Sequence, residues 1–353
     1  MASSLNNSAW LEWMTTLMAG SSQGGVSRYT HAATFPPHRF YCLLDEIPLH
    51  LIPQRALRLL RAKNSTNELL FLNPECTICP AGQLPDELAA EKQLLAGFAL
   101  QGTIAWVRDA ATGSLLPFWL GPGLEVLVLS AKRGEPMSAN LSAAARMWLA
   151  AAGILTPEDH AARRLREWKD AVEKAAPVFR GKGYAPIADL IHPFHIAALR
   201  RYYRHLIRTG AIKLGDGQSP RRYVAYNEPV ARFFHCQIAA TLSAVAGQPL
   251  KPSYVYMASY LSGAELKKHT DREQCDFSVT LCLDFSPEPA LETSWPIHLD
   301  TSGGTSTVYQ ALGDALAYRG IRLPHYRGVL REGQTSTSIF FHYVRADFAG
   351  SLD

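Results

Sequence analysis

The chain has 353 residues, of which 47% are hydrophobic and 19% charged, and its formal net charge is +4. This composition excludes a disordered chain, and the length suits one large domain or two of ordinary size. The small net charge gives no sign of the concentrated basic stripe that nucleic-acid binding requires. We therefore expect no nucleic-acid partner.

Cysteine usage and hydropathy indicate a cytoplasmic protein. Six cysteines are too sparse for a disulfide framework. Residues 1–10 lack the basic segment and apolar core of a secretory signal, and no apolar window reaches the ~20 residues of a membrane span. Cys76 and Cys79 form a single Cys-x-x-Cys motif without an evident second ligand pair, so zinc binding there is left open.

Residues 1–175 are rich in Ala and Leu, and we expect them to form a mixed, mainly helical accessory domain. The pattern predicts helices over residues 142–155 and 157–174, the second capped by Thr156. Residues 181–183 (Gly-Lys-Gly) are interpreted as a linker. The accessory domain either presents a peptide or carrier-bound substrate or acts as a scaffold, and a homodimer is left open.

Residues 180–350 change from helical to strand-like texture, so the predicted fold class is α+β. Helices are predicted over residues 195–209 and 229–246. Predicted strands follow over residues 253–261, 276–284, 295–300, 305–310, 315–318, 325–330 and 335–344. Turn residues at 302–304 and 332–333 predict that the flanking strands form hairpins. Many short strands with regular turn signals are typical of a barrel or sandwich.

Three residues of the second half are candidate metal ligands. His269 and Asp271 stand two apart between the first two predicted strands, so in extended chain their side chains point to the same face. His325 begins a later predicted strand and could supply a third ligand. Two histidines and one carboxylate that leave coordination positions open are typical of non-haem Fe(II) oxygenases.

The surroundings of these residues strengthen the interpretation, because one His-x-Asp triplet is expected by chance in a chain with twelve histidines. Residues 260–271 resemble the "Tyr-x-x-Gly … His-x-Asp" motif of the Fe(II)/2-oxoglutarate-dependent oxygenase superfamily, in its prolyl-hydroxylase-like branch. Residues 312–318 resemble the Gly-Asp-aliphatic strand of that family, and Leu323-Pro324-His325 resembles its distal histidine. The resemblance covers about residues 189–348.

The resemblance implies a double-stranded β-helix, or jelly roll, with flanking helices. It also implies Fe(II) held by His269, Asp271 and His325, 2-oxoglutarate as cosubstrate and O₂ as substrate. The activity expected is hydroxylation or desaturation of an unactivated C–H bond, with release of succinate and CO₂. Related halogenases have a small residue in place of the carboxylate, so Asp271 argues for hydroxylation or desaturation.

The chain departs from the family where 2-oxoglutarate is held. The family's basic residue lies nine or ten residues after the second histidine, where this chain has Gln334 and Thr335. A dianion still needs a cation, preferably a guanidinium. Arg327, two residues after His325 and on its face, is the first candidate and Arg331 the second.

Further residues are matched by position. Tyr260 and Thr337 match family hydroxyls that contact 2-oxoglutarate. Trp295 and Arg272 are expected near the mouth of the site, where they could contact substrate. His342 is interpreted as a core histidine.

The sequence leaves the substrate open among peptides, amino-acid derivatives and natural-product intermediates. Two alternatives remain: a non-catalytic jelly-roll module that binds or senses metal, and a metal-dependent oxygenase that does not use 2-oxoglutarate. The second alternative is favoured by the absence of a basic residue at positions 334 and 335.

Overall fold

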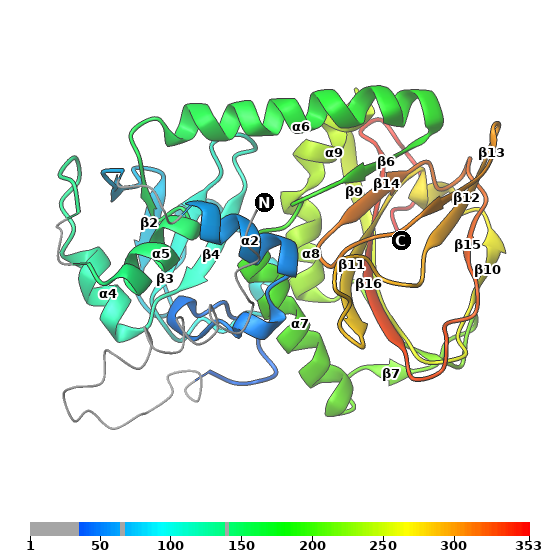
Figure 1. The fold of residues 1–353 in the computed structure, drawn as a ribbon, viewed down its shortest axis with the longest axis horizontal. Coiled ribbons are helices and arrows are strands. Elements are labelled where there is room, and N and C mark those ends of the chain that lie inside the picture. The colour runs from blue at the N-terminus through cyan, green and yellow to red at the C-terminus, as the bar shows by residue number, and fades with distance from the viewer. Residues whose placement is uncertain (1–34, 64–67, 138–140) are drawn as a thin grey trace, which may run out of the picture.

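The computed structural model describes residues 35–63, 68–137 and 141–353, so the prediction about residues 1–10 lies outside it. Helices and sheets are both present, as expected of an α+β chain. In Figure 1 a small N-terminal sheet with its helices lies at one end of the molecule and two larger sheets lie at the other. One long helix runs beside both ends.

The N-terminal part is built on a three-stranded antiparallel sheet of order β2-β3-β4. Its middle strand carries the buried side chains of Ile104 and Trp106, and the Trp119 indole donates to the carbonyl of Ala99 at 2.6 Å. Strands β1 and β5 form a separate pair. The elements of this part are α2 (Gln54–Lys63), β1 (Phe71–Leu72), β2 (Cys76–Cys79), α3 (Asp86–Ala89), β3 (Ile104–Arg108), β4 (Leu115–Trp119), α4 (Pro122–Leu129), α5 (Ala143–Ala151) and β5 (Leu155–Thr156).

Helix α6 (His160–Lys182) replaces both the shorter helix and the linker that the sequence predicted. Thr156 belongs to β5, and Asp159 is the N-cap residue instead. At the other end Gly183 adopts a left-handed φ of 78° and its N–H donates to Phe179, which closes the helix. The predicted linker is therefore wrong, and a 23-residue helix joins the two ends of the molecule.

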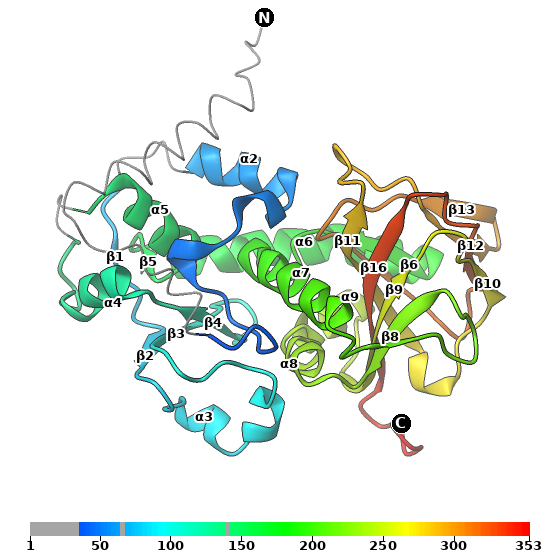
Figure 2. The same ribbon diagram turned by 90° about the horizontal axis from the view of Figure 1, so that it is seen from below.

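Three helices fill the space between the N-terminal sheet and the larger sheets (Figure 2). They are α7 (Pro193–Arg208), α8 (Pro229–Gln237) and α9 (Ala239–Ala246). The helix predicted over residues 229–246 is thus divided at Ile238. Helix α8 begins where the Glu228 carboxylate accepts from the N–H groups of Val230 and Ala231. One continuous cluster of buried apolar residues includes Trp106, Phe233 and Phe341, so the two ends of the molecule share a core.

The two larger sheets lie at the C-terminal end. The seven-stranded sheet has the order β6-β14-β11-β16-β9-β8-β7 and the four-stranded sheet has the order β10-β15-β12-β13. Their strands are β6 (Tyr184–Ile187), β7 (Lys213–Leu214), β8 (Arg222–Tyr226), β9 (Leu250–Tyr260), β10 (Leu266–His269), β11 (Phe277–Ser286), β12 (Ile297–Thr301), β13 (Gly304–Val308), β14 (Ala315–Tyr318), β15 (His325–Arg327) and β16 (Thr335–Arg345).

The seven-stranded sheet has two different faces. Val279 and Phe341 on one face join the core that contains the helices. Tyr260, Cys282 and Phe340 on the other face form a second apolar cluster with Trp295. We call this second face the inner face, because it packs against residues that flank the strands of the four-stranded sheet. These are Ala264 before β10, Trp295 before β12 and Leu330 after β15.

One predicted hairpin is confirmed and one is wrong. Strands β12 and β13 pair directly through Thr301 and Gly304. Strands β15 and β16, however, belong to different sheets, because β15 pairs with β10 and β12 whereas β16 pairs with β11 and β9. Residues 328–334 therefore carry the chain from one sheet to the other.

Two other expectations concern membranes and cysteines. Within the described ranges no helix combines the length and the apolar character that crossing a bilayer requires. Cys76 and Cys79 are buried in β2, and no described group of three close metal-ligand side chains includes them. Burial raises the pKa of Cys76 to about 12, so its thiol is protonated.

Candidate metal centre

His269, Asp271 and His325 converge as the sequence predicted. Their ligand atoms all lie within 4.8 Å of one another. His269 and His325 are opposite each other in the β10–β15 ladder, and their ring centroids are 4.4 Å apart. Each histidine places Nε2 at 3.6 Å from the Asp271 Oδ1 atom. Two histidines and a carboxylate therefore point at one position from one side.

Backbone carbonyls set the orientation of both imidazoles. The Nδ1 atom of His269 lies 2.8 Å from the carbonyl oxygen of Lys267, and that of His325 lies 3.0 Å from the carbonyl oxygen of Leu323. A carbonyl can only accept, so Nδ1 carries the proton in each ring and Nε2 keeps its lone pair. Nε2 is the atom that faces Asp271, and this arrangement is the usual one for metal-binding histidines.

The protonation states suit a cation at this position. Burial lowers the pKa of His325, so this imidazole is neutral at pH 7. With no metal bound, the Asp271 carboxylate stabilises a proton on Nε2 of His269 and so raises its pKa, and a bound cation would take the place of that proton. Burial alone would raise the pKa of Asp271, but the imidazoles of His269 and His325 beside it lower it. A largely buried carboxylate that stays ionised is a strong attractor for a divalent ion.

The second oxygen of Asp271 is held by protein groups. The Ser278 hydroxyl donates to Asp271 Oδ2 at 2.9 Å and lies 2.9 Å from the His342 Nδ1 atom. Asp271, Cys275 and His342 also form a group with metal-ligand spacing. Because the Ser278 hydroxyl already bonds two of these three side chains, we interpret the group as a support for Asp271. His342 is thus a buried histidine, as expected, and it also contacts the site.

Gly320 allows the chain to pack closely against Asp271 and Ser278. Its carbonyl accepts from the Asp271 N–H at 3.0 Å. A Cβ atom at this position would collide with Asp271, the Cys275 carbonyl and Ser278, so only glycine fits. The segment between β14 and β15 therefore supports two ligands. It contacts Asp271 through Gly320 and His325 through Leu323.

Arg327 lies inside the C-terminal half, two residues after His325 on β15. Its side chain is buried and donates to the Trp295 carbonyl at 2.6 Å and to Gln310 Oε1 at 3.0 Å. Its Nε atom is buried without a partner, and within the described residues no carboxylate pairs with it. Burial lowers the pKa of Arg327, although a guanidinium remains charged. A buried cation held only by neutral groups is costly, so the site fits an anion.

Sequence reasoning missed Arg222, which lies on β8 opposite Tyr260. Its Nη1 atom donates to the Tyr260 hydroxyl at 3.2 Å, and its other nitrogens bond Asp216 and Gln218. Burial works against ionisation of Asp216, but hydrogen bonds from Arg222 and Tyr256 lower the pKa of this carboxyl to about 2. No motif marks Arg222, because its role depends on the pairing of β8 with β9. Unlike Arg327, this guanidinium has its own carboxylate.

Three predicted contacts find other surroundings. The Thr337 hydroxyl donates to Ser259 at 2.8 Å, on the face opposite Tyr260, and Ser336 is the residue paired with Tyr260. This geometry contradicts the predicted role of Thr337. Arg331 is exposed in the segment between β15 and β16, unlike the buried Arg327. Trp295 is not at a mouth but buried, with its ring 5.0 Å from that of Tyr260.

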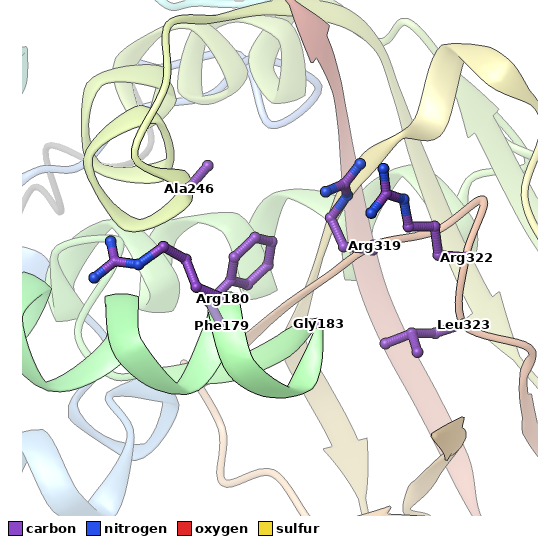
Figure 3. Close-up of a pocket in the computed structure, with 7 residues that line it drawn as sticks. All are labelled: Phe179, Arg180, Gly183, Ala246, Arg319, Arg322 and Leu323. Carbon is purple, nitrogen blue, oxygen red and sulfur yellow. The ribbon is translucent and has the colours of Figure 1, made fainter. Parts of the chain in front are cut away.

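A cavity of about 280 Å³ lies outside this centre, between the end of α6 and the segment before β15 (Figure 3). It is lined by Phe179, Arg180, Gly183, Ala246, Arg319, Arg322 and Leu323. Arg319 is paired with Asp276 at 2.6 Å. The cavity adjoins the back of the segment that supports the ligands and contains none of the three ligands.

Comparison with known proteins gives structural likeness only. No family model matches the chain, and no curated protein matches its sequence. The chain is similar to the 2-oxoglutarate-dependent epimerase SnoN of nogalamycin biosynthesis, with a TM-score of 0.43 and 16% identity over 50% of this chain and 84% of that one. It is also similar to a prolyl-4-hydroxylase of Pseudomonas putida (TM-score 0.41, 16% identity, 49% and 98% covered). A third is HygX of Streptomyces hygroscopicus, solved with nickel and 2-oxoglutarate (TM-score 0.40, 14% identity, 50% and 87% covered). At these scores the site's own geometry, not the likeness, must support a function.

Proposed function

We propose that this chain is an Fe(II)- and 2-oxoglutarate-dependent oxygenase that hydroxylates or desaturates an unactivated C–H bond. The observation that carries the proposal is the convergence of His269, Asp271 and His325, with both Nε2 atoms 3.6 Å from the carboxylate. Three ligands on one side of an ion leave positions for a bidentate cosubstrate and O₂. A structural zinc site would instead be closed by a fourth protein ligand.

The strand order supports the jelly-roll fold that the resemblance implies. Strands β9, β11, β14 and β16 lie in one sheet, and β10, β12, β13 and β15 lie in the other. Successive strands thus alternate between the two sheets along much of the chain, which is the winding of a double-stranded β-helix. The metal ligands come from β10, from the residues after it and from the start of β15.

Arg327 is the residue proposed to hold the distal carboxylate of 2-oxoglutarate. It follows His325 by two residues on the same strand, roughly 7 Å along the chain and on the same face. This spacing is comparable with the length of a five-carbon dicarboxylate whose other end chelates the metal. Its unpartnered Nε atom and the absence of a paired carboxylate among the described residues support the assignment.

The neighbouring side chains would exclude water from this cosubstrate. Tyr260, Trp295 and Leu330 are buried and pack together beside Arg327. Arg222 orients the Tyr260 hydroxyl through its hydrogen bond. When bound, Fe(II) with 2-oxoglutarate and O₂ supplies the oxidation of the C–H bond and releases succinate and CO₂. The chain's own contribution is to hold the metal through its three ligands, to neutralise the distal carboxylate of 2-oxoglutarate with Arg327 and to exclude water from the site.

The proposed reaction is tested by Fe(II)-dependent conversion of 2-oxoglutarate to succinate. We expect turnover by the intact protein and its loss in His325→Ala and Asp271→Ala. His298→Ala is the matched control, because His298 lies half-exposed on β12 and stacks on Tyr326 instead of facing Asp271. Slow turnover without the true substrate is covered by anaerobic titration of 2-oxoglutarate into the Fe(II) protein, followed by visible absorption.

The outcomes also separate the alternatives. Metal binding without binding or turnover of 2-oxoglutarate would support a sensing module or an oxygenase with another cosubstrate, and would refute the proposal. Failure of the intact protein to bind any divalent metal would refute all three. We further propose that the substrate is a small molecule or peptide that approaches the site from the side of the three metal ligands.

A further inference from the structure

Arg272 directly follows the ligand Asp271, and its guanidinium is held by two tyrosines. The guanidinium carbon lies 4.5 Å from the centroid of the Tyr254 ring. Its Nε atom donates to the Tyr254 hydroxyl and its Nη2 atom to the Tyr226 hydroxyl, both at 3.3 Å. The two tyrosine rings lie 5.0 Å apart. The side chain is thus placed, although it is exposed to solvent.

This guanidinium lacks a negative partner. Within the described residues no carboxylate forms an ion pair with Arg272, and the other side chain close to its guanidinium is the Cys275 thiol. The Tyr254 phenol is neutral, because burial raises its pKa. The contrast is Arg222, whose guanidinium is paired with Asp216.

The three side chains lie at the metal end of the inner face. Tyr254 and Tyr256 are two residues apart on β9, and Tyr256 packs with the inner-face cluster, so both rings point to the inner side. The Tyr254 ring is 4.6 Å from that of His342, which reaches Asp271 through Ser278. Tyr226 continues this layer on β8 and is 47% exposed, so the layer is open to an incoming molecule.

We propose that Arg272, Tyr226 and Tyr254 bind an oxyanion of the substrate, a carboxylate or a phosphate, beside the metal. The inference rests on the proposed function and names the substrate class, an acid. A guanidinium matches both oxyanions with two parallel hydrogen bonds, and the exposed ring of Tyr226 offers an apolar surface to the rest of the molecule. The substrate acid and the cosubstrate would not compete, because the latter is assigned to the buried Arg327.

The test uses inorganic phosphate and acetate as probes on the Co(II)- and 2-oxoglutarate-loaded protein. Relaxation of the phosphate ³¹P nucleus or the acetate ¹³C nucleus by Co(II) reports an oxyanion held near the metal. We expect saturable relaxation with the intact protein and at least tenfold weaker binding in Arg272→Gln. Arg166→Gln, on the exposed side of α6, is the control with the same charge change and should match the intact protein. Preference for one probe identifies the kind of oxyanion.

A second, more conservative variant keeps the proposal testable if Arg272→Gln fails to fold. Tyr226→Phe removes one phenol that restrains the guanidinium, and we expect severalfold weaker phosphate or acetate binding. Equal relaxation in the intact protein, Arg272→Gln and Tyr226→Phe would overturn the inference, as would direct coordination of both probes to Co(II) that survives Arg272→Gln. The Co(II) ligand-field spectrum is recorded in every sample. A protein that never acquires that spectrum refutes the proposed metal centre instead, so the two failures are distinct.

Discussion

The Ser278 hydroxyl lies 2.9 Å from Oδ2 of Asp271, the carboxylate oxygen that faces away from the two histidines. The same hydroxyl contacts the Cys275 carbonyl and the His342 imidazole. Burial lowers the pKa of His342 to about 4, so this ring is neutral at pH 7. Ser278 therefore fixes the rotation of Asp271 and leaves Oδ1 for a metal.

Ser278→Ala should weaken Co(II) or Fe(II) binding by roughly 10- to 100-fold, the usual effect of removing a hydrogen bond that orients a metal ligand. Isothermal titration with Co(II) measures it. Thr280→Val is the matched control, because Thr280 lies two residues along β11 and its hydroxyl is buried without a partner. That substitution should leave metal affinity unchanged. Equal affinities in both variants would show that Ser278 has no orienting role.

Arg327→Met should lower the affinity for 2-oxoglutarate by about 100-fold, on the order of 3 kcal/mol, because a buried charge-assisted contact is lost. Metal affinity should stay as in the intact protein. Anaerobic titration of the Fe(II) protein with 2-oxoglutarate gives both values. Arg331→Met, which removes an exposed arginine, should behave as the intact protein does. An unchanged affinity in Arg327→Met would remove this residue from the cosubstrate site.

Two buried histidines predict a loss of stability in mild acid. Burial lowers the pKa values of His195 and His235 to about 3, and each ring donates to a backbone carbonyl. As the pH falls below ~6.5, the unfolded chain takes up protons that the folded chain refuses. The unfolding free energy should therefore fall by about 2 kcal/mol for each histidine between pH 6.5 and 5, and continue to fall toward pH 3.

Urea unfolding at several pH values measures this slope. His235→Gln should reduce the slope by about one proton. A slope that does not change in His235→Gln would mean that this ring is protonated in the folded protein.

The three ligands could be predicted because local chemistry specifies them. A two-residue spacing in extended chain places His269 and Asp271 on one side, and the strand that starts at His325 has its own turn signals. Strands β11 and β14 were likewise predicted to within two residues, since their alternation and flanking turns are local.

The features that were missed depend on pairing between distant segments. Which face Thr337 occupies follows from its partners Ser259 and Asp284, and β-bulges shift the register of both neighbouring ladders. A shift of one residue turns a side chain to the other face, and the sequence of β16 alone carries no sign of it. Arg222 was missed for the same reason. Helix α6 extends past its predicted end because packing against its neighbours keeps Pro177 and Gly181 helical in spite of their low helix propensity.

Arg200 joins both ends of the molecule, and its removal should destabilise the whole chain. This fully buried guanidinium on α7 donates to Asp284 on β11 at 3.0 Å and to the Leu51 carbonyl of the N-terminal part at 2.7 Å. Arg200→Met leaves these acceptors and Glu288 underpaired, which should cost about 3 kcal/mol of unfolding free energy. Arg204→Met is the control, because Arg204 binds the same carboxylate but is 44% exposed, and we expect a loss below about 1 kcal/mol.

Urea unfolding followed by tryptophan fluorescence and by far-ultraviolet circular dichroism measures both variants. Fluorescence is weighted toward the N-terminal part, which contains Trp106, Trp119 and Trp148 against Trp295 in the strand-rich part, whereas circular dichroism follows the helices and strands of both. Because the buried core is continuous and Arg200 bonds both ends, the signals should coincide in one transition, and Arg200→Met should shift both equally. Two separate transitions, with only one moved by the substitution, would show that residues 1–175 and 180–350 fold independently.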